Sequence, residues 1–296
     1  MQIIAGSSNL SLTQRIANEI SAEMLNTQIN KFSDGEIKVQ VHGRIGKDVV
    51  LVQSTSNPVN DNLLELLLLA DTVKRAGATN IIAIIPYFGY SRQDKCTYKN
   101  GPISARLVAK LIESSGINSI ITLDLHSSQI EGFFNIPITN FSTASLFLPI
   151  LEKQDNIIMV SPDIGGVARA RNYSELLGVD LAIINKSRDL NNKCTMNGLV
   201  GEVKDFHCVI VDDIIDSANT ICSATDLLLN QGAFSVSALI THGVLSDNAI
   251  EKVEKSGLRS VYISDSINVL NNSQKITIVP VHELLASALS QNIVNG

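Results

Sequence analysis

The sequence lacks the features that mark several common classes of protein. It has four cysteines with no CxxC spacing, which predicts reduced thiols rather than a disulfide framework or a zinc site. No block of like charge occurs among its 23 basic and 29 acidic residues, so no basic face for nucleic acid is evident. The longest apolar run, 63–70, is interrupted by Glu65 and is far too short to span a membrane. The N-terminal residues show no secretion signal. We therefore expect a soluble, cytoplasmic protein without nucleic-acid or membrane partners.

The composition supplies enough apolar material for a large core. Of the 296 residues, 45% are apolar and 18% are charged, which excludes a disordered chain. This length exceeds the usual size of one core, so two domains of about 150 residues each are expected. β-Branched runs fall into one group before about residue 140 and another after it. We place the domains at 1–140 and 141–296, with the last helix able to pack back on the first.

Short apolar runs alternate with amphipathic helical patterns along the whole chain. The expected strands are Gln2–Ile4, Val49–Gln53, Ile81–Pro86, Ser119–Leu123, Asn156–Val160, Leu181–Asn185, Cys208–Val211, Val236–Thr241, Val261–Ile263 and Ile276–Val279. The expected helices are Asn62–Ala76, Ile103–Ser115, Gly165–Leu177, Asn219–Gln231 and Asp247–Lys255. Glycines that suit a left-handed helix end follow these helices, namely Gly77, Gly116, Gly178, Gly232 and Gly257. The pattern predicts an α/β fold with two mainly parallel sheets, each flanked by helices.

The segment after strand 208–211 is the most informative one. Asp212 and Asp213 follow directly, and the small polar run 216–220 precedes a helix. The N–H groups and partial positive charge of a helix N-terminus suit a phosphate, while carboxylates suit sugar hydroxyls or magnesium. A plain buried strand and a capped helix would explain the valines and the threonine, but not two acids at a strand end. We interpret the segment as a phosphosugar site.

Three more expected strands end in polar residues, at the edge where parallel sheets bind ligands. His126 follows strand 119–123, Asp163 follows strand 156–160, and Lys186 and Arg188 follow strand 181–185. Each has a structural explanation when taken singly: a structural histidine, a helix-capping aspartate, and a solvated pair of cations. Four such strand ends together favour a phosphate-binding site.

Two loops of the first half carry aromatic residues beside charged ones. The turn 31–36 combines Phe32 with two acids, and the loop 86–95 leads from aromatic residues into Arg92 and Gln93. Aromatic and amide groups can sandwich a purine, and an arginine can bind its phosphates. Packed surface loops would show the same residues, so both interpretations remain open at this point.

Taken together, these segments resemble the ribose-phosphate pyrophosphokinase family, whose members make phosphoribosyl pyrophosphate. The resemblance covers nearly the whole chain and rests on FSDGE at 32–36, QSTSNPVND at 53–61, IPYFGYSRQD at 85–94, LDLHSSQIEGFFNIP at 123–137, SPD at 161–163, NKSRD at 185–189 and VDDIIDSANT at 211–220. It implies two phosphoribosyltransferase-like α/β domains in a homo-oligomer, a hexamer or another assembly built from dimers. It also implies an active site between the domains that borrows from a neighbouring subunit.

The resemblance implies a role for each of these motifs. ATP would be bound by Phe32, Asp34, Gly35, Glu36, Arg92 and Gln93, with residues 34–36 supplied by a neighbouring subunit. Mg²⁺ would be held by His126 and Asp163. Lys186 would be the catalytic lysine, and Arg188 would be its partner on the transferring phosphates. Ribose 5-phosphate would be bound by Arg188, Asp212, Asp216, Ser217, Ala218, Asn219 and Thr220.

The reaction implied is transfer of the β,γ-diphosphoryl group of ATP to the anomeric hydroxyl of ribose 5-phosphate, with release of AMP. A phosphoribosyltransferase is an alternative, although it would need one such domain and no FSDGE turn. A catalytically silent regulatory paralogue is another, and it draws on Ile164 and Asn219, which differ from the residues expected at these places. Because asparagine tolerates the left-handed conformation, we expect Asn219 to preserve the shape of the loop. A dinucleotide-dependent oxidoreductase is disfavoured because no GxGxxG follows the first strand.

Overall fold

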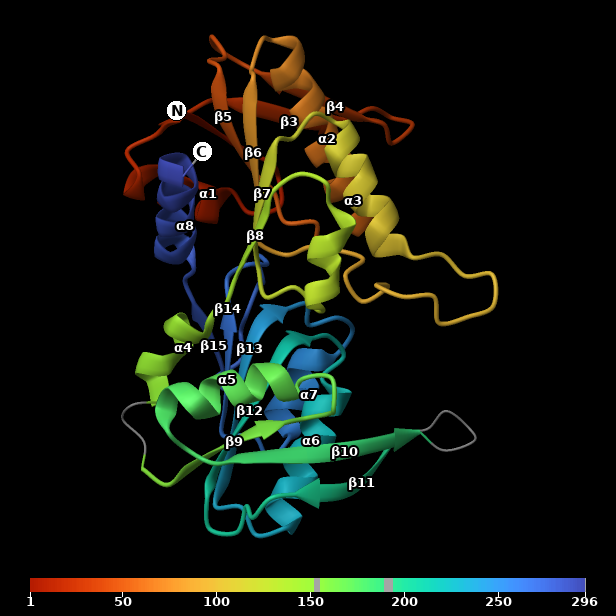
Figure 1. The fold of residues 1–296 in the computed structure, drawn as a ribbon, viewed down its shortest axis with the longest axis vertical. Helices are drawn as coiled ribbons and strands as arrows, with labels where there is room; N and C mark the ends of the chain where they lie inside the picture. Colours follow the sequence, from red (N-terminus) through yellow and green to blue (C-terminus); the bar gives the residue numbers. More distant parts are fainter. Residues whose placement is uncertain (152–154, 189–193, 296) are drawn as a thin grey trace. The chain divides into compact units, whose positions relative to one another are not determined.

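The chain forms two compact units, each built around one sheet (Figure 1). The computed structural model describes the backbone of residues 1–151, 155–188 and 194–295, and their side chains except those of 186–188, 194–197 and 292–295. Unit 1 comprises Met1–Ser142, Ser266–Asn268 and Pro280–Gly296, and unit 2 comprises Thr143–Asp265 and Val269–Val279. Two C-terminal segments that lie in the predicted range 141–296 therefore belong to unit 1. None of the helices in the described residues is long and apolar enough to cross a membrane.

The sheet of unit 1 has six strands in the order β2-β1-β5-β6-β7-β8, and all neighbouring pairs are parallel. These strands are β1 (Gln2–Ala5), β2 (Glu23–Met24), β5 (Asp48–Val52), β6 (Asn80–Ile85), β7 (Ser119–Leu123) and β8 (Ile138–Phe141). A separate antiparallel hairpin consists of β3 (Thr27–Lys31) and β4 (Ile37–Val41).

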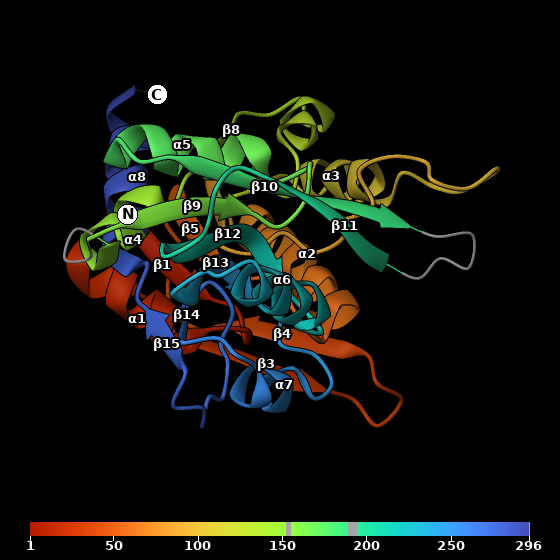
Figure 2. The same cartoon turned by 90° about the horizontal axis from the view of Figure 1, so that it is seen from below.

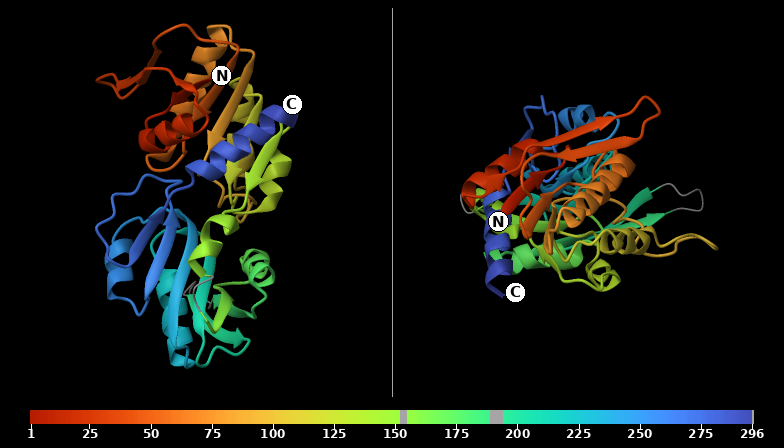
Figure 3. Two further views of the ribbon diagram at one scale, coloured as in Figure 1. Left: turned by 90° about the vertical axis from the view of Figure 1, so that its left-hand side faces the viewer. Right: turned by 90° about the horizontal axis from the view of Figure 1, so that it is seen from above.

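Helices cover both faces of this sheet. They are α1 (Leu10–Glu19), α2 (Val59–Arg75), α3 (Ser104–Ser114), the short 3₁₀ helix η1 (Ser128–Phe133) and α8 (His282–Asn295). Alternate strand residues such as Val49 and Leu51 pack with Leu66 and Leu69 of α2 in one buried cluster. Helices α1 and α8 lie on the opposite face, and Figure 3 shows α8 running across the sheet.

The sheet of unit 2 has seven strands in the order β11-β10-β9-β12-β13-β14-β15. Only the edge strand β11 is antiparallel to its neighbour among these strands. The strands are β9 (Ile157–Ser161), β10 (Leu181–Arg188), β11 (Cys194–Val200), β12 (His207–Ile215), β13 (Ser235–Gly243), β14 (Ser260–Ser264) and β15 (Ile276–Val279). From β10 to β15 the order repeats that of unit 1, so β12 occupies the place that β5 has there.

Two pairs of helices cover the faces of the second sheet (Figure 2). They are α4 (Ala144–Leu151) and α5 (Val167–Leu177) on one face, and α6 (Asn219–Asn230) and α7 (Ala249–Lys255) on the other. Val209 and Val211 of β12 pack with Phe147 of α4, whereas Ile210 packs with Leu228 of α6. The strand is buried on both sides, which is why its sequence is continuously apolar.

The predicted α/β class with mainly parallel sheets is confirmed, and a strand forms at each of the predicted runs. Four of the glycines proposed as helix ends adopt positive φ, but Gly257 does not. A side chain at Gly257 would instead lie 2.5 Å from Cδ1 of Leu229, so packing against α6 explains the glycine there. The sequence pattern missed the half-exposed hairpin β3–β4, the edge strands β2, β8 and β11, and helices α1 and α4.

Candidate functional site

Strand β12 is longer than predicted and contains both acidic residues. It pairs with β13 as far as Ile215↔Gly243, but its pairing with β9 ends at Ile210↔Val160. Strand β9 itself ends at Ser161, and the chain then turns toward α5. Asp212 and Asp213 therefore lie where β12 runs past its neighbour, not beyond the strand end as the sequence suggested.

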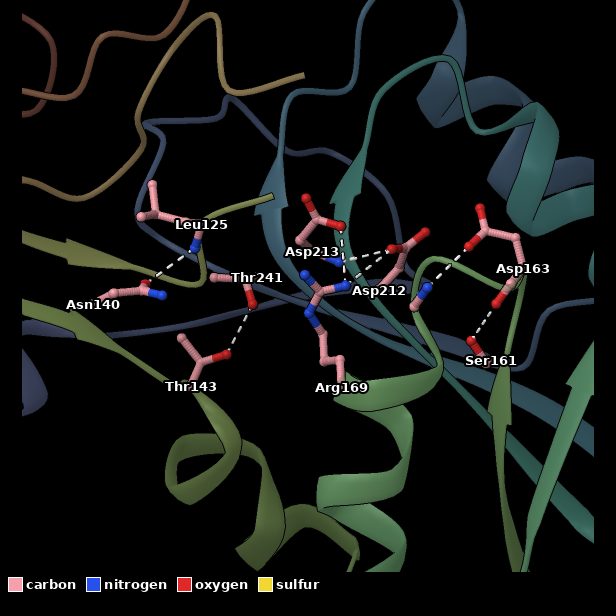
Figure 4. A network of polar contacts seen from close by, with 10 residues as sticks. Leu125, Asn140, Thr143, Ser161, Asp163, Arg169, Asp212, Asp213 and Thr241 are labelled. Atoms are coloured by element: carbon pink, nitrogen blue, oxygen red, sulfur yellow. Dashed lines mark hydrogen bonds and ion pairs between the residues drawn. The ribbon is translucent and has the colours of Figure 1, made fainter. Parts of the chain in front are cut away.

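One arginine holds both carboxylates. Nη1 of Arg169, on the first turn of α5, lies 3.0 Å from Oδ1 of Asp213 and 3.4 Å from Oδ1 of Asp212 (Figure 4). Asp213 is buried, and the side chains of Arg169 and Asp212 retain only 17% and 19% of their exposure. Oδ1 of Asp212 also accepts the backbone N–H of Asp213 at 2.9 Å. The sequence identified Arg169 only as a helical residue, because its partners are set by the packing of α5 on β12.

The negative charge of this cluster exceeds the charge of its arginine. Burial raises the pKa of Asp212 well above its usual range, and the neighbouring carboxylates of Asp213 and Asp163 raise it further, while Arg169 acts in the opposite direction. An ionised Asp212 therefore gains from any hydrogen-bond donor or cation that reaches it. Sugar hydroxyls and a hydrated metal ion are both suitable donors.

Asp163, a predicted metal ligand, lies in the turn between β9 and α5. Its Oδ1 accepts the N–H of Gly166 at 3.0 Å, and its carbonyl oxygen accepts the hydroxyl of Ser161 at 2.7 Å (Figure 4). The side chain thus fixes the turn but does not cap α5, whose N-cap residue is Gly166, and it is half-buried near Asp212. The other predicted ligand, His126, is exposed in unit 1, after β7.

The donor set suits a magnesium ion that is held mainly by substrate and water. No group of three His, Cys, Asp or Glu residues in the described part of the chain could hold a metal by itself. Magnesium prefers oxygen ligands, keeps several waters, and is commonly bound through one or two carboxylates plus phosphate oxygens. Asp163 fits that pattern.

The loop 216–220 turns the end of β12 into helix α6. Ala218 has the left-handed conformation (φ 62°, ψ −1°), and Asn219 is the first residue of α6. The left-handed residue of the loop is thus Ala218, and Asn219 does not use its tolerance of that conformation. The first helical bond joins the N–H of Cys222 to the carbonyl of Ala218, and no side chain of residue 218 caps the helix. The N–H groups at the start of α6 thus precede the first helical hydrogen bond, and the partial positive charge of a helix start suits an anion.

Lys186 and Arg188 belong to β10, which continues beyond its predicted end. Lys186 pairs with Met196 and Arg188 with Cys194 in the antiparallel ladder with β11. Their side chains lie outside the described residues, so their predicted catalytic roles stay predictions.

The turn FSDGE forms the tip of the β3–β4 hairpin in unit 1. The N–H of Phe32 donates to Glu36, and that of Gly35, with φ 94°, donates back to Phe32, each at 2.9 Å. Phe32 is 53% exposed, and Asp34 and Glu36 are exposed as well. The ring and the carboxylates are therefore accessible to a ligand or another chain.

The loop 86–95 is only partly the aromatic platform that the sequence suggested. Phe88 is buried and contacts Phe134 edge-on at 5.8 Å, and Tyr87 is buried too, so these two rings belong to the core. Arg92 and Gln93 are exposed, and Oε1 of Gln93 accepts the hydroxyl of Ser104 at 2.7 Å.

Comparisons with known proteins show which family the chain resembles. Residues 1–116 match the family model of the N-terminal domain of ribose phosphate pyrophosphokinase, and residues 186–296 match that of the phosphoribosyl synthetase-associated domain. The chain is 44% identical to a ribose-phosphate pyrophosphokinase of Helicobacter hepaticus, over 97% of this chain and 94% of that protein. It is 42% identical to one of Thermotoga maritima, over 98% and 94%.

A solved structure is similar over the full length. It is phosphoribosylpyrophosphate synthetase from Mycobacterium smegmatis, with 33% identity, a TM-score of 0.93, and coverage of 100% of this chain and 99% of the other. Sequence and structure thus agree, and the chain belongs to the ribose-phosphate pyrophosphokinase family.

Proposed function

We propose that this chain transfers the β,γ-diphosphoryl group of ATP to the anomeric hydroxyl of ribose 5-phosphate, giving 5-phosphoribosyl 1-pyrophosphate and AMP for nucleotide biosynthesis in the cytoplasm. One observation carries the proposal. In a member of this family, two carboxylates on the strand that leads to the N-terminus of α6 share one arginine. This places acceptors for sugar hydroxyls and donors for a phosphate at one edge of one sheet.

Ribose 5-phosphate is bound at this edge. The N–H groups at the start of α6 and the side chains of Ser217 and Thr220 donate to the 5-phosphate, which the helix dipole also attracts. Asp212 accepts hydrogen bonds from the ribose hydroxyls. Its raised pKa supports this role, since such bonds stabilise a carboxylate that burial and its neighbours penalise.

Lys186 and Arg188 stabilise the charge that develops on the transferring diphosphoryl group. Phosphoryl transfer depends on alignment and on electrostatic stabilisation more than on covalent chemistry. Asp163 and His126 would hold Mg²⁺, which when bound neutralises phosphate charge and orients the chain of phosphates.

ATP is bound by Arg92, Gln93 and the FSDGE turn. The exposure of Phe32, Asp34 and Glu36 supports a turn that serves the active site of a neighbouring copy, in a homo-oligomer built from dimers. Within the hairpin, Nζ of Lys38 lies 6.0 Å from the centroid of the Phe32 ring and makes a cation–π contact with it.

The test is an assay of AMP and phosphoribosyl pyrophosphate made by the purified chain from ATP, ribose 5-phosphate and Mg²⁺. We expect equal amounts of both products and none without ribose 5-phosphate. A phosphoribosyltransferase or a silent paralogue would release no AMP, and that result would refute the proposal.

A matched pair of variants tests the site itself. Asp212→Asn should lower kcat/KM for ribose 5-phosphate by at least about tenfold. Asp226→Asn, on the exposed face of α6, should leave it unchanged. Equal behaviour of the two variants would remove Asp212 from the binding site.

A further inference from the structure

The connection from β13 to α7 contacts the end of β12 and the start of the loop 216–220 through consecutive residues. The N–H groups of Val244 and Leu245 donate to the carbonyl of Ile215, at 2.9 and 3.1 Å. The hydroxyl of Ser246 donates to Oδ1 of Asp216. A single segment of the chain thus holds the end of β12 and the first residue of the loop.

Lys252 of α7 continues this set of contacts across the rest of the loop. Its Nζ donates to the carbonyl of Ser217 at 3.1 Å and to Oδ1 of Asn219 at 2.8 Å. These two acceptors flank Ala218, so one ammonium group joins the residues on both sides of it. Ala249 and Val253 of α7 are fully buried, which fixes the helix that carries Lys252.

The loop has a conformation that needs such support. Ala218 is in the left-handed region with φ 62°, which is unfavourable for a residue with a Cβ. This unfavourable residue lies immediately before the first N–H groups of α6. Holding the carbonyl of Ser217 and the side chain of Asn219 keeps those donors in place before an anion binds, and preorganised donors bind more tightly.

We propose that Lys252 is a positioning residue for the binding of ribose 5-phosphate, acting through Ser217 and Asn219. This role of Lys252 rests on the proposed function, which assigns the loop 216–220 to the binding of the 5-phosphate. It adds that Asn219 is a hydrogen-bond partner of α7, and not merely a substitute for a smaller loop residue. Lys252 itself does not touch the reacting atoms.

The experiment measures KM and kcat for both substrates in Lys252→Met, Lys252→Arg and the control Lys255→Met. Lys255 lies on the same helix, is exposed and pairs with Glu251. In Lys252→Met we expect the KM for ribose 5-phosphate to rise about tenfold, with the KM for ATP and kcat within about twofold of wild type. Lys252→Arg should restore most of the loss, and Lys255→Met should match wild type.

A double-mutant cycle tests the route of the effect. In an Asn219→Gly background, Lys252→Met should raise the KM for ribose 5-phosphate by a clearly smaller factor, because one of the two acceptors is gone. Equal factors in the two backgrounds would overturn the part assigned to Asn219.

Two outcomes separate this inference from the proposed function. If wild type releases AMP but Lys252→Met keeps a normal KM for ribose 5-phosphate, the inference fails and the function stands. If wild type is inactive, the proposed function is refuted. Protection of the protein against thermal unfolding by ribose 5-phosphate then tests whether Lys252 positions the loop for this ligand. Equal protection of wild type and Lys252→Met, or of neither, would refute the positioning role.

Discussion

Arg169→Met tests the electrostatic account of the site most directly. The guanidinium lies within 3.4 Å of two carboxylates that are largely buried, so its loss leaves both without their shared cation. Breaking a buried ion pair costs about 3–5 kcal/mol. Because Asp212 and Arg169 keep a little exposure, we expect the lower end, about 3 kcal/mol.

The assay is urea unfolding at one fixed protein concentration, since assembly would shift the midpoint. Adding Asp213→Asn to Arg169→Met should recover about half of the loss, because it removes one of the two uncompensated charges. A loss under about 1 kcal/mol, or no recovery in the double variant, would refute the reasoning.

The stability loss of Arg169→Met should also change with pH in a predictable direction. The pKa of Asp212 is already raised by burial and by Asp213, and removing Arg169 raises it further. A folded state that binds a proton more tightly than the unfolded one loses stability as pH rises above the unfolded value. The deficit of Arg169→Met should therefore grow as pH rises above the pKa that Asp212 has in the folded wild type, and a deficit that shrinks would contradict the account.

Three further predictions concern single positions. Lys186→Ala should lower turnover at least about a hundredfold in the AMP assay, and near-normal turnover would exclude Lys186 from the mechanism. Gly89→Ala should destabilise by about 2–4 kcal/mol in urea, because its methyl group would lie 2.3 Å from a backbone carbonyl oxygen, whereas Gly132→Ala meets no atom within 4 Å and should be nearly neutral. Burial raises the pKa of the Cys208 thiol to about 12, so iodoacetamide at pH 8 should label the exposed Cys96 first and Cys208 only after unfolding; equal labelling rates would argue against its burial.

Most of the strands that the sequence revealed are buried on both faces, although the edge strand β15 is partly exposed. Their continuous β-branched runs reflect helices packed above and below them, so the pattern is strong. The hairpin β3–β4 has half-exposed residues along its length and many polar ones, and its pattern is weak for that reason. Helix α4 contains Pro149, which hides a helical pattern in the sequence.

The acidic part of the site was predictable because carboxylates next to a buried strand are costly and call for an explanation. Its partners were not, since Arg169 and Lys252 reach the site through the packing of α5 and α7 on the sheet. The position of the left-handed residue could not be predicted from the sequence for a similar reason. Backbone conformation at Ala218 is set by contacts on both sides of the loop, and these outweigh the intrinsic preference of asparagine.

The return of α8 to α1 affects how the molecule is made. A nascent chain has all strands of its first sheet by residue 141, yet the helix that covers part of that sheet spans His282–Asn295. At about 5–20 residues per second, a ribosome needs roughly 7–30 s to reach it. During that interval the apolar part of the sheet that α8 covers stays exposed. Unit 2 can therefore fold before unit 1 is complete. Deletion of about the last dozen residues would therefore destabilise unit 1, which is the part of the protein that is synthesised first.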